Sequence, residues 1–337
     1  MKVLFIGGTG NISGACTRMA LDQGIEVFHL NRGNRDIPDG VVTFQADIND
    51  HGLIRSLLGD RVFDVVVNFV AFTVEDIDRD FDLFSGKTAQ YIFISSASAY
   101  QKPLMHPVIT ESTPLKNPFW DYSRDKIACE ERLHELYRTR DFPMTIVRPS
   151  LTYDTVIPVA IGGWDDYTIV DRMKKGKPVI VHGDGTSLWT ITHSRDFARG
   201  FTGLLGHQQA IGESFHITSD EILTWDQIYE DVAAAAGVKP NLVHITSEFI
   251  CTAAEKAGQG WMWGNLLGDK AVSAIFDNSK IKRYVPGFEA VIPFKQGIKQ
   301  TVDWFESDPS RMTIVNETNV LMDRIIETYN KALDLIV

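Results

Sequence analysis

The sequence has few cysteines, no long hydrophobic run and fewer positive than negative charges. Its three cysteines, Cys16, Cys129 and Cys251, lie far apart, without a CxxC pair or a cysteine–histidine cluster. We therefore expect neither a disulfide framework nor a metal site, and reduced thiols fit a cytoplasmic protein. The apolar start is too short and too glycine-rich for a signal peptide, and no stretch of about 18 apolar residues suggests a membrane partner.

The shortage of positive charge limits the kind of partner. Lys and Arg number 33 against 44 Asp and Glu, which gives a net charge of −11. Because polyphosphates bind to basic faces, nucleic acid is not expected as the main partner. A small anionic ligand remains compatible, since it needs only a local positive site. The length of 337 residues has room for about two domains at roughly 150 residues each.

The first half alternates short apolar runs with amphipathic stretches. Near-continuous β-branched runs separated by helices are typical of a parallel sheet covered on both faces. We expect strands at residues 3–6, 26–30, 42–44, 62–69, 91–95 and 145–147, and helices at residues 13–23, 51–58 and 122–138. Residues 1–150 are therefore predicted to form a doubly wound parallel α/β domain.

After residue 150 the pattern loosens. Helices are expected at residues 169–175, 194–205, 225–236, 246–257 and 320–335, and strands at residues 179–181 and 215–217. Thr224 is a candidate N-cap of one helix, with Gln227 at the capping-box position. We expect residues 151–337 to form mostly a smaller substrate-binding α/β lobe that is packed onto the first domain, with chain crossings.

A glycine loop lies between the first expected strand and helix, with the spacing Gly7-x-x-Gly10-x-x-Ser13. Gly7 lets the chain turn, Gly10 lets the backbone approach a pyrophosphate, and N–H groups at the helix start hold phosphates. Ser13 stands where a third glycine is frequent, and a small residue still permits close packing. The position directly after a strand predicts a dinucleotide site. The alternative is a glycine turn that binds nothing.

The end of the second strand indicates which dinucleotide binds. An acidic residue there would bind a ribose 2′-hydroxyl, whereas arginine suits a 2′-phosphate. The chain has Asn31, Arg32 and Arg35 and no carboxylate at the strand end, which favours NADP over NAD. Asp47 and Ile48 are placed to meet the adenine. A solvated basic loop and a helix-capping aspartate are the alternative interpretations.

A polar turn and a helix start predict the catalytic group. Ser96 follows the apolar strand that ends at Ser95, and Tyr122 and Lys126 are four residues apart, so they share one helix face. A lysine near a tyrosine lowers the phenol pKa, which makes Tyr122 a better base. Ser96 would hydrogen-bond the substrate oxygen. Each pattern alone is common, but their order after a glycine loop is specific.

In these motifs the sequence resembles the short-chain dehydrogenase/reductase superfamily, and in particular its extended branch, the NAD-dependent epimerase/dehydratase family. The family's glycine motif matches Gly7, Gly8, Thr9, Gly10, Asn11 and Ile12, and its catalytic residues match Ser96, Tyr122 and Lys126. The resemblance implies a Rossmann fold in which Phe69, Val70, Ala71, Ser95 and Pro149 lie beside the nicotinamide end of the cofactor. By analogy it also implies a homodimer through the helix at residues 122–138.

The resemblance predicts an NAD(P)-dependent dehydrogenase or reductase that acts on a sugar-like or other small hydroxyl or carbonyl substrate. The alternatives are a sugar epimerase that works through a transient ketone, and a non-catalytic dinucleotide- or RNA-binding protein, because atypical members bind RNA. Trp189 replaces an arginine that often holds a nucleotide-sugar phosphate, which argues against such a substrate. Candidate substrate residues are Phe72, Ser98, Tyr153, Trp164, Trp189 and His193, with core packing as the alternative.

Overall fold

The apolar runs of the first half form one parallel sheet. The computed structural model describes residues 1–335, and within them the central sheet has seven strands in the order β12-β7-β5-β4-β1-β2-β3. These strands are β1 (Lys2–Ile6), β2 (Glu26–Asn31), β3 (Val42–Gln45), β4 (Phe63–Asn68), β5 (Thr88–Ile94), β7 (Met144–Pro149) and β12 (Ser214–Ile217). Each pairs in parallel with its neighbours, so the predicted doubly wound sheet is confirmed.

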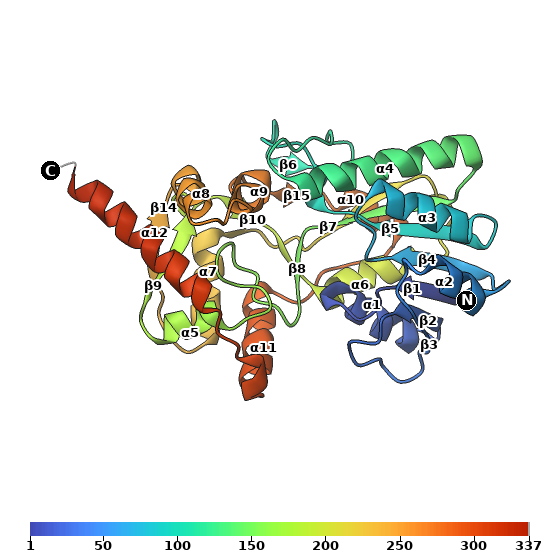
Figure 1. Ribbon diagram of the computed structural model, residues 1–337, viewed down its shortest axis with the longest axis horizontal. Coiled ribbons are helices and arrows are strands. Elements are labelled where there is room, and N and C mark those ends of the chain that lie inside the picture. The colour runs from blue at the N-terminus through green and yellow to red at the C-terminus, as the bar shows by residue number, and fades with distance from the viewer. Residues whose placement is uncertain (336–337) are drawn as a thin grey trace.

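Helices cover both faces of this sheet because alternate residues of each strand point to opposite sides. In β1, Val3 and Phe5 face one core and Leu4 and Ile6 face the other. The first core is covered by α1 (Asn11–Asp22), α6 (Ser194–Thr202) and α10 (Ser279–Tyr284), and the second by α2 (His51–Leu58), α3 (Val74–Phe84) and α4 (Asp121–Arg140). Figure 1 shows this sheet domain at the right of the view.

A third core lies in the lobe at the left of Figure 1. The lobe is built from β9 (Pro178–His182), β14 (Asn241–Ile245), α5 (Thr168–Lys174), α7 (Trp225–Ala235), α8 (Ser247–Lys256), α9 (Met262–Asn265), α11 (Phe294–Glu306) and α12 (Asn316–Asp334). The capping box predicted for α7 is present, since the Gln227 N–H donates to Thr224 Oγ1 at 3.1 Å and the Thr224 N–H donates to Gln227 Oε1 at 2.9 Å. The end of α12 extends away from the sheet domain.

Three short strand pairs and four short helical turns lie outside the elements named above. The pairs join β6 (Val108–Ile109) to β15 (Ile275–Phe276), β8 (Leu151–Tyr153) to β11 (Ile191–His193), and β10 (Leu188–Trp189) to β13 (Leu223–Thr224). The turns are η1 (Ala97–Ala99), η2 (Gln208–Ala210), the π-helical turn η3 (Leu266–Lys270), and η4 (Pro309–Arg311). The chain returns from the lobe to add β12 beside β7.

The helices α3 and α11 were not predicted from the sequence. In α3 a capping box joins Thr73 and Asp76, but the helix buries Arg79 and Asp80 together with its apolar residues, so charge interrupts the expected apolar stripe.

Across residues 1–335, the structure contains no helix with both the length and the apolar character that crossing a bilayer requires.

Candidate functional site

The glycine loop between β1 and α1 has a conformation that glycine adopts easily. Gly7 has a φ of 82°, and a Cβ atom there would lie 2.5 Å from Cγ1 of Val70. At Gly8 a Cβ atom would lie 2.3 Å from Nε2 of His29. Both distances are too short for a side chain, so the loop requires glycine for its backbone angle at Gly7 and for close packing at both positions.

Ser13 holds this loop together from the first turn of α1. The Gly10 N–H donates to Ser13 Oγ at 2.7 Å, and the Ser13 hydroxyl donates to the Gly7 carbonyl at 2.7 Å. The Ser13 side chain is buried. The serine therefore does more than permit close packing, because its hydroxyl joins the two glycines that shape the loop.

A buried histidine supports the loop from below. The Thr17 hydroxyl donates to the Gly8 carbonyl at 3.0 Å and lies 2.9 Å from His29 Nε2. Since the Thr17 hydrogen is directed at Gly8, His29 Nε2 must carry the proton that is donated to Thr17. Burial lowers the pKa of His29 to about 4, so the ring is neutral at physiological pH.

A cavity of about 680 Å³ opens beside the loop, and we call it the glycine-loop cavity. It is lined by Ile6, Gly7, Thr9, Gly10, Leu30, Asn31, Arg32, Asn34, Arg35, Ala46, Asp47, Ile48, Asn49, Val70 and Phe72. The residues predicted at the end of β2 and after β3 are thus brought together with the loop. Ile6, Leu30, Asn34, Ala46 and Asn49 were not among the predicted site residues.

The glycine-loop cavity has the donors that a dinucleotide requires. The first turn of α1 has neither an acidic residue nor a side-chain cap within the described chain, so its N–H groups and helix dipole can meet phosphates. Asn31 Nδ2 is buried and has no hydrogen-bond partner among residues 1–335. Arg35 donates to the Thr9 carbonyl at 3.1 Å, which fixes a cation beside the loop. These residues fit an anionic dinucleotide.

A second cavity of about 330 Å³ continues from the first, and we call it the Tyr122 cavity. It is lined by Gly7, Gly10, Asn11, Ile12, Ser13, Phe69, Val70, Phe72, Ile94, Ser95, Ser96, Tyr122, Lys126, Pro149, Ser150, Thr152 and Trp164. Two of the predicted cofactor-binding residues lie on neither cavity. Gly8 faces His29 and a smaller depression, and Ala71 is buried and contributes only its carbonyl.

Lys126 is fixed by the backbone of the sheet domain. Its Nζ donates to the Ala71 carbonyl at 2.6 Å and to the Ile94 carbonyl at 2.9 Å, and it lies 4.5 Å from the Phe72 ring centre. Burial lowers the pKa of Lys126 to about 8. Phe72, predicted as a substrate residue, therefore packs on the lysine and lines the two cavities of the sheet domain.

The prediction that Lys126 lowers the Tyr122 pKa is wrong for the protein alone. Burial raises the pKa of Tyr122, the Ser96 hydroxyl opposes that shift, and the Asp269 charge adds to it. Lys126 Nζ lies 5.8 Å from the Tyr122 ring centre and is directed at two carbonyls. Desolvation therefore outweighs any attraction between the two side chains.

Three serine hydroxyls orient one another beside Tyr122. Ser123 Oγ donates to Ser98 Oγ at 2.7 Å, and Ser98 Oγ lies 2.9 Å from Ser96 Oγ. Because Ser98 accepts from Ser123, its own hydrogen is free to be donated to Ser96. The Ser96 hydrogen can then be directed into the cavity. Ser98 is thus a positioning group for Ser96. It also lines the indole cavity that is described below.

Ser95 belongs to a buried polar network behind the site. Its hydroxyl donates to Glu130 Oε1 at 2.5 Å, and Arg148 donates to both oxygens of Glu130. Arg148 Nη1 also donates to the Tyr100 hydroxyl at 3.2 Å, which lies 3.0 Å from His216 Nδ1. The network holds β5, α4 and β7 together by buried, charge-assisted bonds.

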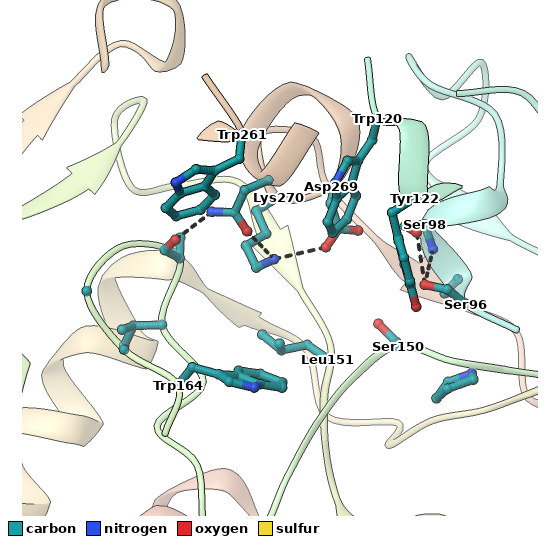
Figure 2. A pocket seen from close by; sticks show the side chains of 17 residues that line it. Ser96, Ser98, Trp120, Tyr122, Ser150, Leu151, Trp164, Trp261, Asp269 and Lys270 are labelled. Atoms are coloured by element: carbon teal, nitrogen blue, oxygen red, sulfur yellow. Dashed lines mark hydrogen bonds and ion pairs between the residues drawn. The ribbon is translucent and has the colours of Figure 1, made fainter. Parts of the chain in front are cut away.

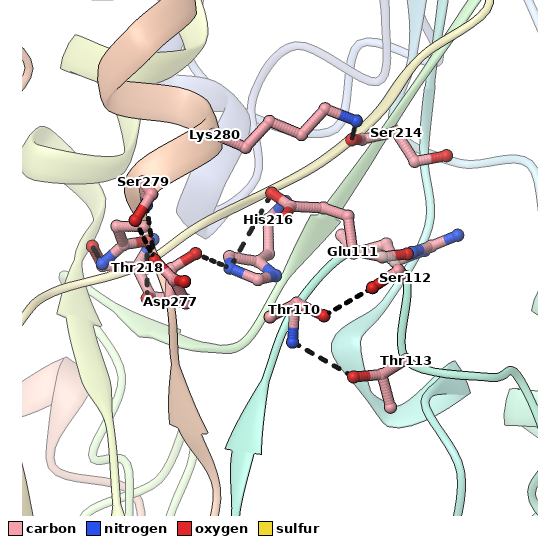
Figure 3. Close-up of polar contacts among 12 residues, drawn as sticks. Thr110, Glu111, Ser112, Thr113, Ser214, His216, Thr218, Asp277, Ser279 and Lys280 are labelled. Carbon is pink, nitrogen blue, oxygen red and sulfur yellow. Dashed lines mark hydrogen bonds and ion pairs between the residues drawn. The ribbon is translucent and has the colours of Figure 1, made fainter.

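The far end of this network reaches the surface. Figure 3 shows His216 between Glu111 and Asp277, with Lys280 and Ser214 close by. His216 Nε2 lies 2.9 Å from the Asp277 carbonyl, and burial lowers the pKa of His216. Two of the surrounding cations are paired, since Lys280 donates to Glu213 at 2.7 Å and Arg148 is held by Glu130. We interpret this region as structural.

A third cavity of about 400 Å³ lies between the sheet domain and the lobe, and we call it the indole cavity (Figure 2). It is lined by Ser96, Ala97, Ser98, Trp120, Tyr122, Pro149, Ser150, Leu151, Val159, Ala160, Gly162, Gly163, Trp164, Trp261, Asn265, Asp269 and Lys270. Ser96 and Tyr122 therefore line both this cavity and the Tyr122 cavity.

Three predicted substrate residues line none of the three cavities. Tyr153 is fully buried, with its ring centre 5.1 Å from that of His193. Trp189 is also buried and packs on Trp225 at 5.4 Å between ring centres. Tyr153, His193 and Trp189 are therefore packing residues, because their strands β8, β11 and β10 turn these side chains into the cores. Of the predicted substrate residues, Trp164 and Ser98 line the indole cavity.

The sequence interpretation did not identify the lobe's contribution. Lys270 donates to Asp269 Oδ2 at 3.1 Å and to Asn265 Oδ1 at 2.9 Å. In Figure 2 this pair lies across the cavity from Trp164. Both charged residues belong to the π-helical turn η3, a feature that is frequent at functional sites but has no sequence signature. The structure shows no group of His, Cys, Asp and Glu that could hold a metal within residues 1–335.

Comparisons with known proteins agree with this geometry. The model of the NAD dependent epimerase/dehydratase family matches residues 3–218. A chloroplast stem-loop binding protein of 41 kDa from Arabidopsis thaliana is 26% identical over 72% of this chain, and the match spans 65% of that relative. The 2′-dehydrokanamycin reductase of Streptomyces kanamyceticus is 24% identical over 86% of this chain and 80% of its own length.

Solved structures show the same fold. An epimerase from Methanothermobacter thermautotrophicus has a TM-score of 0.73 at 15% identity, covering 92% of this chain and 94% of that one. The dTDP-glucose 4,6-dehydratase of Bacillus anthracis, solved with NAD, has a TM-score of 0.70 at 19% identity, covering 92% and 98%. The predicted Rossmann-type architecture is thereby confirmed.

Proposed function

Because the chain belongs to the NAD-dependent epimerase/dehydratase family, as its motifs predicted, we propose that it is an NAD(P)-dependent oxidoreductase acting on a sugar-like or other small hydroxyl or carbonyl substrate. One observation carries this proposal. Ser96 and Tyr122 line both the Tyr122 cavity, which continues from the glycine loop, and the indole cavity. A proton-transfer group at the junction of two cavities suits a reaction between two bound molecules.

In this proposal residues 1–150 bind the cofactor and residues 151–337 mostly form the substrate-binding lobe. The N–H groups of the glycine loop and of the α1 start would hold the phosphates, and Asn31, Asp47 and Ile48 would meet the adenosine. When bound, a nicotinamide dinucleotide supplies the redox chemistry. The small substrate is supported by the modest volume of the indole cavity, about 400 Å³.

Tyr122 would act as the general acid or base at the substrate oxygen. It takes the hydroxyl proton in oxidation and returns it in reduction. Ser96 would donate a hydrogen bond to the same oxygen and stabilise the charge that develops there. Lys126 uses two of its three N–H groups on the Ala71 and Ile94 carbonyls, so one remains to hold a cofactor hydroxyl.

A simple reductase is our first choice over an epimerase. The reductase of Streptomyces kanamyceticus is similar over 86% of this chain, whereas a UDP-glucose 4-epimerase of Lactobacillus helveticus is similar over 39% of it. The direct test measures nicotinamide absorbance with a panel of sugars, sugar acids and their keto derivatives, with Tyr122→Phe as control. Turnover lost in the variant supports the proposal. Tight RNA binding by a protein that turns over no substrate would overturn it, and isomerisation without net cofactor change would make it an epimerase.

NADP is the proposed cofactor in preference to NAD. Support comes from Arg32, Asn34 and Arg35 on the glycine-loop cavity and from Asn31 where an acid would favour NAD. The dissociation constants of NADPH and NADH should be compared for the wild type and Arg32→Ala. Tighter NADPH binding that the variant loses is expected. Tighter NADH binding by the wild type would contradict the choice.

Two further points complete the proposal. We infer a cytoplasmic protein, supported by three free cysteines that are all buried.

We also infer a homodimer through α4, which light scattering can test by measuring the mass in solution. A mass equal to the 37.8 kDa of one chain would contradict the dimer.

A further inference from the structure

The indole cavity has a wall chemistry that differs from that of the glycine-loop cavity. Three indoles, from Trp120, Trp164 and Trp261, line it, and only one acid and one base among the described residues do so. These are Asp269 and Lys270, which pair with each other at 3.1 Å. The charged lining is therefore balanced, and its one cation is already bound to a carboxylate.

Trp164 is held on the cavity by an unusual backbone. Its φ is 105°, a value that side-chain-bearing residues rarely adopt, and 44% of the residue is exposed. A bridge to Ile157 fixes it, because the Trp164 N–H donates at 2.9 Å and the Trp164 carbonyl accepts at 2.8 Å. Strained residues of this kind cluster at ligand-binding sites, and a strained, exposed indole indicates a stacking surface.

The opposite wall offers a matched donor and acceptor. Lys270 Nζ binds Asn265 and Asp269, which leaves one of its three hydrogens unused. Lys270 donates to Oδ2 of Asp269, and Oδ1 of Asp269 accepts no hydrogen bond from any residue that the structure describes. Neighbouring hydroxyls on one ring present the complementary acceptor and donor, because each hydroxyl can do both.

We propose that this cavity binds a phosphate-free, polyhydroxylated ring, which stacks on Trp164 while Asp269 and Lys270 bind its hydroxyls. This inference rests on the proposed function and deepens it by naming the substrate class. The C–H face of such a ring is apolar and suits an indole, whereas its hydroxyls suit the charged pair. Reduction or oxidation then takes place at the ring carbon that lies at Tyr122 and Ser96.

A nucleoside diphosphate does not suit this wall. A diphosphate carries two negative charges and is bound in proteins by arginine forks, lysines or helix N-termini. No arginine lines the cavity within residues 1–335. Lys102, the next cation, is buried behind the wall, where its Nζ lies 3.5 Å from the Asp269 carbonyl and 6.0 Å from the Trp189 ring. A diphosphate would therefore face Asp269 without a free cation.

The test compares two ligand classes on the full chain with saturating NADP. Tryptophan fluorescence and calorimetry measure the binding of UDP-glucose and dTDP-glucose, and of methyl glycosides of glucose, galactose and mannose together with myo-inositol. We expect at least one phosphate-free ring to bind and both nucleotide sugars to bind at least tenfold more weakly. Equal or tighter binding of a nucleotide sugar overturns the proposal, and so does binding of neither class.

Variants test whether the named wall is used. Asp269→Asn and Trp164→Ala should each weaken ring binding roughly 10-fold or more. Asp269→Asn should leave the NADPH dissociation constant unchanged, because Asp269 lines neither the glycine-loop cavity nor the Tyr122 cavity. Trp263→Ala is the matched control, because its indole bonds to Glu255 at 3.1 Å and lies off the cavity. Ring affinity that is unchanged in Asp269→Asn and Trp164→Ala overturns the proposal. If NADPH itself does not bind the wild type, the proposed function fails instead.

Discussion

The glycine-loop cavity and the indole cavity are built in different ways. The first is lined by residues at the ends of four strands that follow one another in the chain, β1 to β4, all within residues 6–72, and its loop is shaped by glycine backbone. The second is lined by residues from the turn after β5, α4, β7, the loop after β8, α9 and the η3 turn, which are far apart in the chain. A site made of backbone needs glycine at fixed spacing, whereas a site made of side chains needs only their final positions.

The largest expected effect is at the junction of the two cavities. Replacing Tyr122 by Phe removes the proton-transfer group and should lower kcat/KM by about 10²–10⁴-fold. The NADPH dissociation constant should change little, because the ring remains. Tyr137→Phe, on the exposed part of α4, is the matched control. Retained activity in Tyr122→Phe would mean that the chemistry is carried by the lobe, for example by Asp269.

The next effect concerns the buried network of the sheet domain. Glu130→Gln leaves Arg148, whose side chain is 4% exposed, as an unpaired buried cation. Urea unfolding should show a loss of about 3–5 kcal/mol. Asp154→Asn breaks the more exposed pair with Arg18, which joins the sheet domain to the segment after β8, and should cost at most about 1 kcal/mol. Similar losses in the two variants would contradict this ranking.

A pH-dependent effect on stability is expected from His29, the buried residue that supports the glycine loop. The pKa of His29 is lowered from 6.5 to about 4 by burial, so the unfolded chain takes up the proton first as pH falls. Stability should therefore be lost between pH 6.5 and pH 4, by at most about 3 kcal/mol from this residue. His29→Gln should make that part of the profile shallower, while buried His182, whose pKa is also lowered to about 4, still contributes to the slope. His51→Gln, at the exposed start of α2, should leave it unchanged.

The smallest effect is at Ser13. Ser13→Ala removes both hydrogen bonds that join Gly7 and Gly10, and we expect a loss of roughly 1 kcal/mol in stability. NADPH should bind a few-fold more weakly, because the loop is less well ordered before binding. Calorimetry measures the affinity, and Ser56→Ala on the exposed face of α2 is the control. An unchanged affinity would show that the glycines alone shape the loop.

This comparison also explains what could be predicted. The strands, the glycine loop and the Tyr122–Lys126 pair were predictable because each depends on residues close together in sequence. Asp269 and Lys270 were not, because a π-helical turn has no residue signature and its place on the same cavity as Tyr122 depends on how the lobe packs. Tyr153, Trp189 and His193 were misassigned since sequence position does not show which face of a short strand points inward.

The return of the chain to form β12 has a consequence for any attempt to separate the parts. All six residues of β7 are buried, and β12 covers one of its sides. A chain cut after residue 150 would leave β7 as an exposed apolar edge strand, a template for aggregation. An exchange of the lobe between relatives therefore has to retain residues 214–217. These residues form β12, an edge strand of the sheet, and they come later in the chain than the lobe elements α5 and β9.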